Sequence, residues 1–321
     1  KTDNGIIRKL DTIYSPGTFF NMDSSVHVSN NIMSIWIEKS KIKKQQKLIV
    51  GISVVNIITG ESFIFEYVSD YNLNPTSFDE LERFVSVYSP NEVILIHPFD
   101  EVTLQNVLQY TNLGEKMLHP IHDEQSNEYE KVKNCRKQVY IFNILESFFG
   151  ENVSSNCTEF AEYAVATQSY CYLLNFIQEH NASMVRNIKI PSFHNTSYRV
   201  VLANHTLKQL NILDDHQSHG PYSSVMKFTN KCCYFGGKRM FQHLLTNPTY
   251  DESWLQTEYD AIESTIQHIS TVNIDICRAE LKKLVDMEKC ARQIVMRKMT
   301  PLQANQFYKS LLSVLFIMNL F

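Results

Sequence analysis

Residues 200–269 read VVLANHTLKQLNILDDHQSHGPYSSVMKFTNKCCYFGGKRMFQHLLTNPTYDESWLQTEYDAIESTIQHI, and this stretch decides the fold. Its apolar residues recur at spacings of three and four, which is the periodicity of an amphipathic α-helix. Breakers fall between the apolar runs at Gly220-Pro221, Gly236-Gly237 and Pro248, because proline lacks the N–H that a helix interior needs. The stretch therefore predicts four helical segments that pack as an all-helical core.

Residues that cap helices stand where these segments begin. Ser223 and Ser224 precede the second segment, and a serine oxygen accepts a hydrogen bond from an N–H group at a helix start. Asp251 opens the last segment. We expect the apolar residues of that segment to face the core, namely Leu255, Tyr259, Ile262 and Ile266.

The order of motifs in this stretch resembles the core domain of MutS mismatch-repair proteins. The resemblance rests on Leu210-x-Ile212 at a helix end, then Ser224-Val225-Met226, Asn230-Lys231-Cys232, Gly237-Lys238-Arg239-Met240 and Pro248. One departure is that Tyr234-Phe235 stands where the family usually has Thr-Pro. Farther on, Asp286-x-Glu288-Lys289 and Arg292 resemble a second family motif, and Thr300-Pro301 begins a long helix that resembles the family's lever arm.

Composition limits the class of protein. With 321 residues, 44% of them hydrophobic, the chain can bury a core and hold two domains. Its formal net charge of −4 gives no global basic field for nucleic acid, so DNA contact would need a local patch or parts outside this chain. Because the chain begins with Lys1 and ends inside an apolar helical run, we expect it to be a piece of a longer protein.

The cysteines and the final apolar run bear on the compartment. Seven scattered cysteines with no CxxC pair indicate reduced thiols in an intracellular compartment. The run 311–321 is about half the ~20 apolar residues of a membrane span. It therefore predicts a core helix, and we expect no membrane partner.

From residue 29 to about residue 99 the periodicity changes to two, and we predict a separate domain over residues 29–155. We expect strands at 31–37, 48–55 and 62–67, a helix at 78–88 capped by Ser77, and a strand at 93–96. Three antiparallel strands followed by a helix and a parallel strand open an RNase H-like fold. The segment GISVVNIITGESFIFEY, residues 51–67, resembles a MutS connector domain, which has that fold. Residues 1–28, with Pro16-Gly17-Thr18, resemble the linker from a mismatch-binding domain missing upstream.

A nuclease on an RNase H-like fold needs clustered carboxylates that hold two Mg²⁺ ions. Asn56 stands where the first carboxylate is needed, and Glu61, Glu66 and Asp70 flank turns. This favours a scaffold. In the polar loop that we expect after a helix in 100–124, one weak metal-site candidate consists of His119, His122 and Asp123.

The rest of the chain completes the second domain. We predict one helix over 128–149, ended by Gly150, and a domain boundary in the Ser/Asn-rich run 151–157. Residues 156–321 are then the first part of an all-helical MutS core, which begins with a helix capped by Thr158.

We expect no catalytic, cofactor-binding or metal-binding residues in this chain. The residues predicted to hold the core together are Gly237, through close packing, Arg239, Pro248, Asp286 and Glu288. Candidates for phosphate contacts lie in the basic hairpin loop, at Lys41, Lys43 and Lys44.

The resemblance implies a connector and core that relay nucleotide state to a DNA clamp in mismatch repair. It implies ATP and Mg for the parent protein, with mismatched DNA, a MutL-like protein and a second MutS-type subunit as partners. Two alternatives stay open. One is an RNase H-like nuclease with a helical accessory domain, and the other is a MutS-like recombination scaffold without mismatch recognition.

Overall fold

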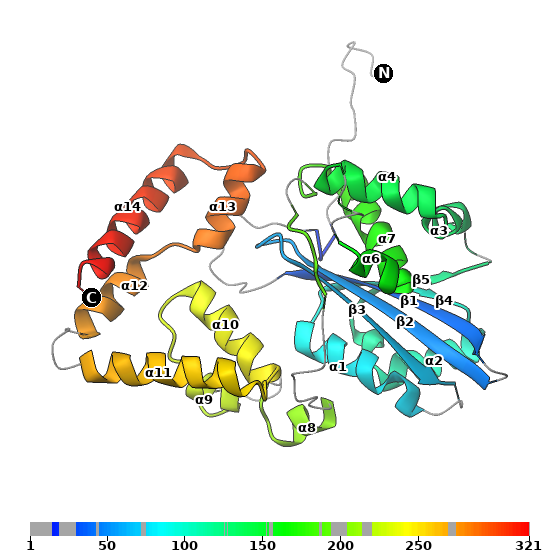
Figure 1. The fold of residues 1–321 in the computed structure, drawn as a ribbon, viewed down its shortest axis with the longest axis horizontal. Helices are drawn as coiled ribbons and strands as arrows, with labels where there is room; N and C mark the ends of the chain where they lie inside the picture. Colours follow the sequence, from blue (N-terminus) through cyan, green and yellow to red (C-terminus); the bar gives the residue numbers. More distant parts are fainter. Residues whose placement is uncertain are drawn as a thin grey trace, which may run out of the picture. The chain divides into compact units, whose positions relative to one another are not determined.

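The computed structural model describes residues 15–18, 30–42, 45–71, 75–124, 126, 128–151, 153, 157–185, 188–193, 204–213, 220–268 and 274–320 (Figure 1). They form two compact units. The first contains Asn30–Ser77 and Ser89–Phe193, and the second contains Phe78–Tyr88 and His194–Phe321.

The first unit is built on a mixed six-stranded sheet. Its strand order is β5-β4-β1-β2-β3-β6. The pairs β1–β2 and β2–β3 are antiparallel, whereas β4 is parallel to β1, β5 to β4 and β6 to β3. The strands are β1 (Asn31–Ile42), β2 (Gln45–Asn56), β3 (Ser62–Asp70), β4 (Glu92–His97), β5 (Met117–His122) and β6 (Ser192–Phe193). The predicted RNase H-like order is confirmed, with a sheet followed by a helical part.

The helices of this unit cover a sheet whose central strands are buried on both faces. Every residue of β4 is buried, and such a strand needs cover above and below. Figure 1 shows α7 with α3, α4 and α6 on one face and α2 on the other. The bounds are α2 (Glu101–Tyr110), α3 (Tyr129–Cys135), α4 (Gln138–Phe149), α6 (Glu159–Glu162) and α7 (Ala164–His180), with short 3-10 helices at Pro75–Phe78 and Leu113–Glu115.

Gly51 lets α7 approach the sheet closely. A Cβ built on Gly51 would lie 2.4 Å from the backbone nitrogen of Ala166, so any other side chain would push the helix away. Beside it on β3, the carboxylate of Glu66 accepts a hydrogen bond from the same nitrogen at 2.9 Å. The N-terminus of α7 is thus seated on β2 and β3, because its unpaired N–H groups favour a carboxylate.

The structure differs from the sequence-based expectations at three places in this unit. Residues 117–122 form an edge strand, not a loop, because Pro120 is tolerated on a strand with one unpaired side. The predicted helix 128–149 is two helices that break at Arg136 and Lys137. Ser77 lies inside the 3-10 helix Pro75–Phe78, and its hydroxyl donates to the carbonyl of Asp70, so it is not at the position that directly precedes α1.

The compact units also divide the chain later than the predicted boundary at 151–157. The sheet-containing unit continues to Phe193. Packing explains the difference, because α7 lies on β1 and β2, where the hydroxyl of Ser169 donates to the carbonyl of Ser34 at 2.8 Å. The single helix predicted to begin at a Thr158 cap is two helices, α6 and α7, which break at Tyr163, and the Thr158 side chain makes no capping hydrogen bond. The apolar spacing predicted helical structure here but did not reveal which domain it covers.

The second unit is helical. It contains α1 (Asp79–Tyr88), α8 (Asn204–Gln209), α9 (Val225–Thr229), α10 (Phe235–Thr246), α11 (Glu252–His268), α12 (Ile274–Lys283), α13 (Met287–Val295) and α14 (Pro301–Met318). Three of the predicted caps, all in this unit, are confirmed. Ser224 accepts from the nitrogen of Lys227 at 3.1 Å, Asp251 accepts from that of Trp254 at 3.2 Å, and Thr300 forms a capping box with Gln303.

The apolar face of α11 differs from its prediction. Tyr259, Ile262 and Ile266 are 59%, 54% and 61% exposed among the residues that the structure describes. Helical spacing shows which side chains share a face, but it does not show what covers that face. On α14, several apolar residues are exposed too, including Leu302, Leu315 and Met318. Over the described residues, no helix combines the length and apolar character that crossing a membrane requires.

Candidate functional site

Two motifs that are far apart in the sequence of the helical unit, one with Arg239 and one with Asp286, come into contact in the structure. Arg239 projects from α10, and Asp286 directly precedes α13. The guanidinium donates from Nη1 to Oδ2 of Asp286 at 2.8 Å and from Nη2 to Oδ1 at 2.7 Å, so both oxygens are held in a planar fork. Nη2 also forms an ion pair with Glu288 at 2.5 Å. The Arg239 and Asp286 side chains are only 13% and 12% exposed.

The same carboxylate begins the next helix. Asp286 Oδ1 accepts from the backbone nitrogen of Lys289 at 3.2 Å, which makes it the N-cap of α13. Burial alone would raise the pKa of Asp286, but the hydrogen bonds and charge of Arg239 outweigh burial and lower it. The hydroxyl of Tyr234, which directly precedes α10, accepts a hydrogen bond from the backbone nitrogen of Met287 at 3.1 Å. Asp286 is therefore fixed as an anion that ties α10 to the start of α13.

The other predicted core residues have simpler surroundings. Gly236 and Gly237 lie in the first turn of α10 and do not interrupt a helix. A Cβ on Gly237 would lie 3.5 Å from that of Cys232, which is an ordinary contact distance, so the close packing expected at this glycine is not found. Pro248 comes two residues after Thr246, the last residue of α10, in agreement with a helix stop at this proline.

The acidic side chains of the sheet are held by neighbouring groups. Glu66 accepts from the N-terminus of α7, Glu61 pairs with Lys189 at 3.1 Å, and Asp70 pairs with Lys47. Burial raises the pKa of Glu66, although the N–H groups of α7 act in the opposite direction. These carboxylates do not converge on one point, so they lack the geometry of a two-metal nuclease site.

Asn56, at the position where a nuclease needs its first carboxylate, has a structural role. Its side-chain oxygen accepts from the backbone nitrogens of Ile58 at 2.9 Å and Thr59 at 3.1 Å. This is an asparagine turn that reverses the chain after β2. Its amide thus shapes a hairpin.

Of the three candidate metal ligands, the structure brings only His122 and Asp123 together, with Nδ1 and Oδ1 3.7 Å apart. His119 and His122 are three positions apart on β5, which puts their side chains on opposite faces. His119 contacts Glu92, whereas Asp123 pairs with Arg136 at 2.8 Å. Throughout the described ranges, no three His, Cys, Asp or Glu side chains are placed to hold a metal ion.

Glu92 is a residue that the sequence did not single out. It begins β4 and is fully buried, yet its carboxylate accepts from Ser15, from the nitrogen of Gly17 at 2.9 Å, and pairs with His119 Nε2 at 2.7 Å. Burial alone would raise the pKa of Glu92, but these hydrogen bonds outweigh it and lower it. The linker-like segment Ser15–Thr18 is thereby anchored to the sheet.

Of the three candidate phosphate contacts, only Lys41 is among the residues that the structure describes. Lys41 is exposed near the end of β1 and faces Gln46 of β2 in the strand register. Lys43 and Lys44 lie outside the described residues. A phosphate contact at this hairpin therefore stays a prediction.

Comparison with known proteins gives the family of the helical part. Residues 205–320 match the family model of MutS domain III. This range contains Arg239, Asp286 and Glu288, so the buried fork lies inside the matched domain.

Similar whole proteins extend the likeness over most of the chain. A putative DNA mismatch repair protein of Acanthamoeba polyphaga mimivirus, a mutS homolog, is 27% identical over 97% of this chain and 30% of its own length. The DNA mismatch repair protein MutS of Caldanaerobacter subterraneus is 25% identical over 92% of this chain and 30% of its own length. That of Clostridioides difficile is 22% identical over 94% and 28%. The chain thus spans about 30% of the length of these relatives.

Proposed function

We propose that this chain, which belongs to the MutS family, supplies the connector and the first part of the helical core to a protein that binds mismatched DNA and hydrolyses ATP. A role of the DNA mismatch-repair type follows at the level of the family. The finer role that we propose for these residues is mechanical. They transmit a conformational change from one end of the helical core to the other.

The observation that carries this proposal is the fork between Arg239 and Asp286. Transmission between distant sites needs stiff elements that move as one body. A bidentate, mostly buried pair that also caps a helix makes the α10–α13 junction stiff, because the two guanidinium bonds fix both distance and orientation. The junction lies within the matched domain III.

In this proposal, ATP and Mg²⁺ bind to parts of the protein outside this chain. A phosphate-binding loop needs a glycine five residues before its second glycine and a Ser or Thr after the lysine. Residues 236–239 read Gly-Gly-Lys-Arg, begin inside α10, and have their arginine engaged by Asp286. These residues do not fit a nucleotide, so no step of ATP hydrolysis is assigned to them.

The proposed partners follow from the same family role. They are mismatched double-stranded DNA, a MutL-like protein at the sheet-containing unit, and a second MutS-type subunit. The placing of the MutL-like protein at the sheet unit rests on the family resemblance. The contacts that engage Glu61, Glu66 and Asp70 favour a scaffold over a metal-dependent active site there.

The test uses the complete protein encoded by the gene that contains this chain. We expect it to bind a duplex with one mismatch more tightly than the matched duplex, and to release it on addition of ATP. The variant Arg239→Ala should keep mismatch binding but lose most of the ATP-induced release, whereas Arg278→Ala, an exposed arginine of the same unit, should behave like the unmodified protein. A complete protein that shows neither mismatch preference nor an ATP effect would contradict the proposal.

A further inference from the structure

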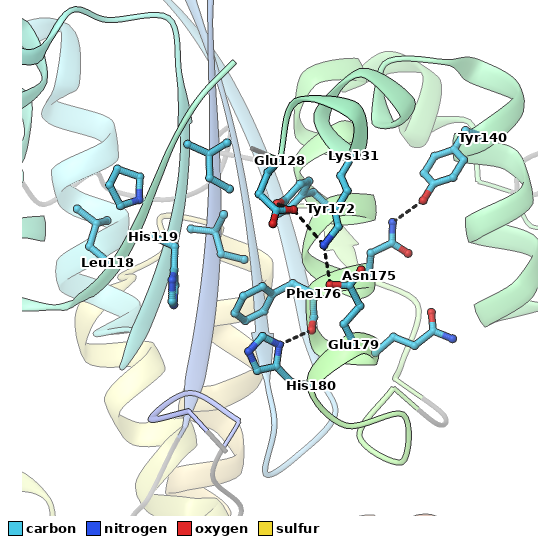
Figure 2. Close-up of a pocket in the computed structure, with 14 residues that line it drawn as sticks. Leu118, His119, Glu128, Lys131, Tyr140, Tyr172, Asn175, Phe176, Glu179 and His180 are labelled. Atoms are coloured by element: carbon cyan, nitrogen blue, oxygen red, sulfur yellow. Dashed lines mark hydrogen bonds and ion pairs between the residues drawn. The ribbon is translucent and has the colours of Figure 1, made fainter. Parts of the chain in front are cut away.

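A cavity opens in the sheet-containing unit, and none of the carboxylates Glu61, Glu66 and Asp70 lines it. It lies between the β4–β5 edge of the sheet and helices α3, α4 and α7, and its volume is about 690 Å³ (Figure 2). Pockets of roughly 300–1,000 Å³ commonly hold small organic molecules. The cavity is therefore large enough for a ligand or for a long side chain of another protein.

Its walls are apolar and aromatic over most of their area. Ile94, Leu118 and Ile121 come from the sheet, and Phe176 and Tyr172 come from α7. Figure 2 shows the α7 side chains opposite Leu118 and His119, with the opening between them. A ligand with a flat or aliphatic body fits such walls, since it replaces water against apolar surface.

Several wall residues are fixed in place before any ligand arrives. His119 is held through Nε2 by the buried Glu92 at 2.7 Å, and its ring lies 5.4 Å from that of Phe176. Asn175 donates to the hydroxyl of Tyr140 at 3.0 Å. A preformed wall lowers the cost of binding because few side chains need to be ordered.

One end of the cavity carries excess negative charge. Lys131 on α3 is paired with two carboxylates, Glu128 at 3.0 Å and Glu179 at 2.8 Å, and all three residues line the cavity (Figure 2). Two carboxylates against one ammonium leave one net negative charge when the imidazoles are neutral. An anion is disfavoured there, because the lysine already has two negative partners.

We propose that this cavity binds an organic cation that has an aromatic or aliphatic body, such as an amidinium, a guanidinium or an alkylammonium. The cationic group lies beside Glu179 and Glu128, and the apolar body lies against Phe176 and Tyr172. The same chemistry is offered by a free amine-like molecule and by an arginine or lysine side chain of a partner. The proposal does not depend on the role of the chain in mismatch repair.

The first experiment compares two molecules of the same shape. Benzamidine is a flat cation, and benzamide is its neutral counterpart. Titrated into the 321-residue protein at pH 8, benzamidine should bind with a Kd near 1 mM, as is typical of a ligand of this size. Benzamide should bind at least about tenfold more weakly, because it lacks the charge. Equal binding of the two, or no saturable binding of benzamidine up to about 10 mM, would overturn the proposal.

Variants then locate the site. Glu179→Gln removes one carboxylate from an exposed helix position and should weaken benzamidine about fivefold. Glu130→Gln removes an exposed carboxylate of α3 that does not line the cavity, so binding should be unchanged. A loss with both variants, or with neither, would show that the cation binds elsewhere. Chemical shifts of the protein's amides, followed in the same titrations, identify the contacted residues independently of affinity.

Two further measurements distinguish a free small cation from a cationic side chain of a partner protein. A short peptide with one arginine is compared with the same peptide in which citrulline, a neutral isostere, replaces it. Arginine-dependent peptide binding that benzamidine displaces, and that is tighter than binding of arginine amide alone, identifies a protein side chain as the occupant. Equal affinity of the peptide and arginine amide identifies a free small cation.

Discussion

Arg239 and Asp286 are 47 positions apart in the sequence and form a two-pronged ion pair, with nitrogen–oxygen distances of 2.8 and 2.7 Å. Asp286 also caps α13, so one carboxylate takes part in both a long-range pair and a local helix start. The pair therefore joins two motifs that are well separated in the sequence.

Removal of the guanidinium should destabilise the helical unit. Arg239→Ala leaves the mostly buried Asp286 without its main partner, and breaking a buried pair in this way costs about 3 kcal/mol. Arg239→Lys keeps the charge but loses the planar fork, so a cost of about 1–2 kcal/mol is expected. Urea unfolding, with hydrogen exchange measured on α10 and α13, gives both values.

The matched control is Arg278→Ala. Arg278 is an exposed arginine of the same unit whose contact, to the carbonyl of Lys231, is 3.4 Å long. We expect its urea midpoint to stay within error of the unmodified protein. Equal effects of the two alanine variants would show that the fork adds no more than a surface arginine does.

Acid should weaken the same junction. The pKa of Asp286 in the folded protein lies below its ordinary value of 3.8. The stability that this carboxylate contributes is therefore fully present above its unfolded pKa, and it is lost as the pH falls through the folded pKa. Urea midpoints measured from about pH 5 to pH 2 should fall more steeply for the unmodified protein than for Asp286→Asn, which cannot titrate there. Parallel pH profiles would contradict this assignment.

The sequence predicted elements and caps better than it predicted their surroundings. Ser224, Asp251 and Thr300 cap helices as expected, because capping is a local interaction within one turn. The strand at 117–122 was missed, because Pro120 and two histidines resemble a loop until the strand is placed at a sheet edge. Pairing with β4 is a long-range property that local composition does not encode.

At the candidate site too, the sequence predicted the residues but not their contacts. The motifs that hold Arg239, Asp286 and Glu288 were found by their family order, but the contacts among them came from the structure. Glu92 was missed because a glutamate before an apolar run usually faces solvent. Its only sequence signal was its place at the start of a strand that is buried throughout.

Gly51 should tolerate no larger side chain. In Gly51→Ala the new Cβ would lie 2.4–2.5 Å from backbone atoms of Val165 and Ala166, so α7 must move off the sheet. Such overpacking costs about 3 kcal/mol in the sheet-containing unit, as urea unfolding would measure it. Gly114→Ala is the matched control, since a Cβ there meets nothing within 4 Å. Similar midpoints for the two variants would show that α7 shifts freely.

Gly17 should be needed to anchor the segment before the sheet. A Cβ on Gly17 would lie 2.6 Å from the carboxylate oxygen Oε2 of Glu92 and 2.7 Å from Ile32, both of them buried. Gly17→Ala should therefore detach Ser15–Thr18 and leave the Glu92 carboxylate with fewer donors, at a cost of about 2 kcal/mol. Hydrogen exchange should become faster at the amides of this segment and remain slow in β2. Pro16→Ala is the control, because Pro16 is exposed and its carbonyl contact to Asn30 is retained. Unchanged exchange at the backbone amide of position 17 in Gly17→Ala would show that Glu92 does not hold the segment.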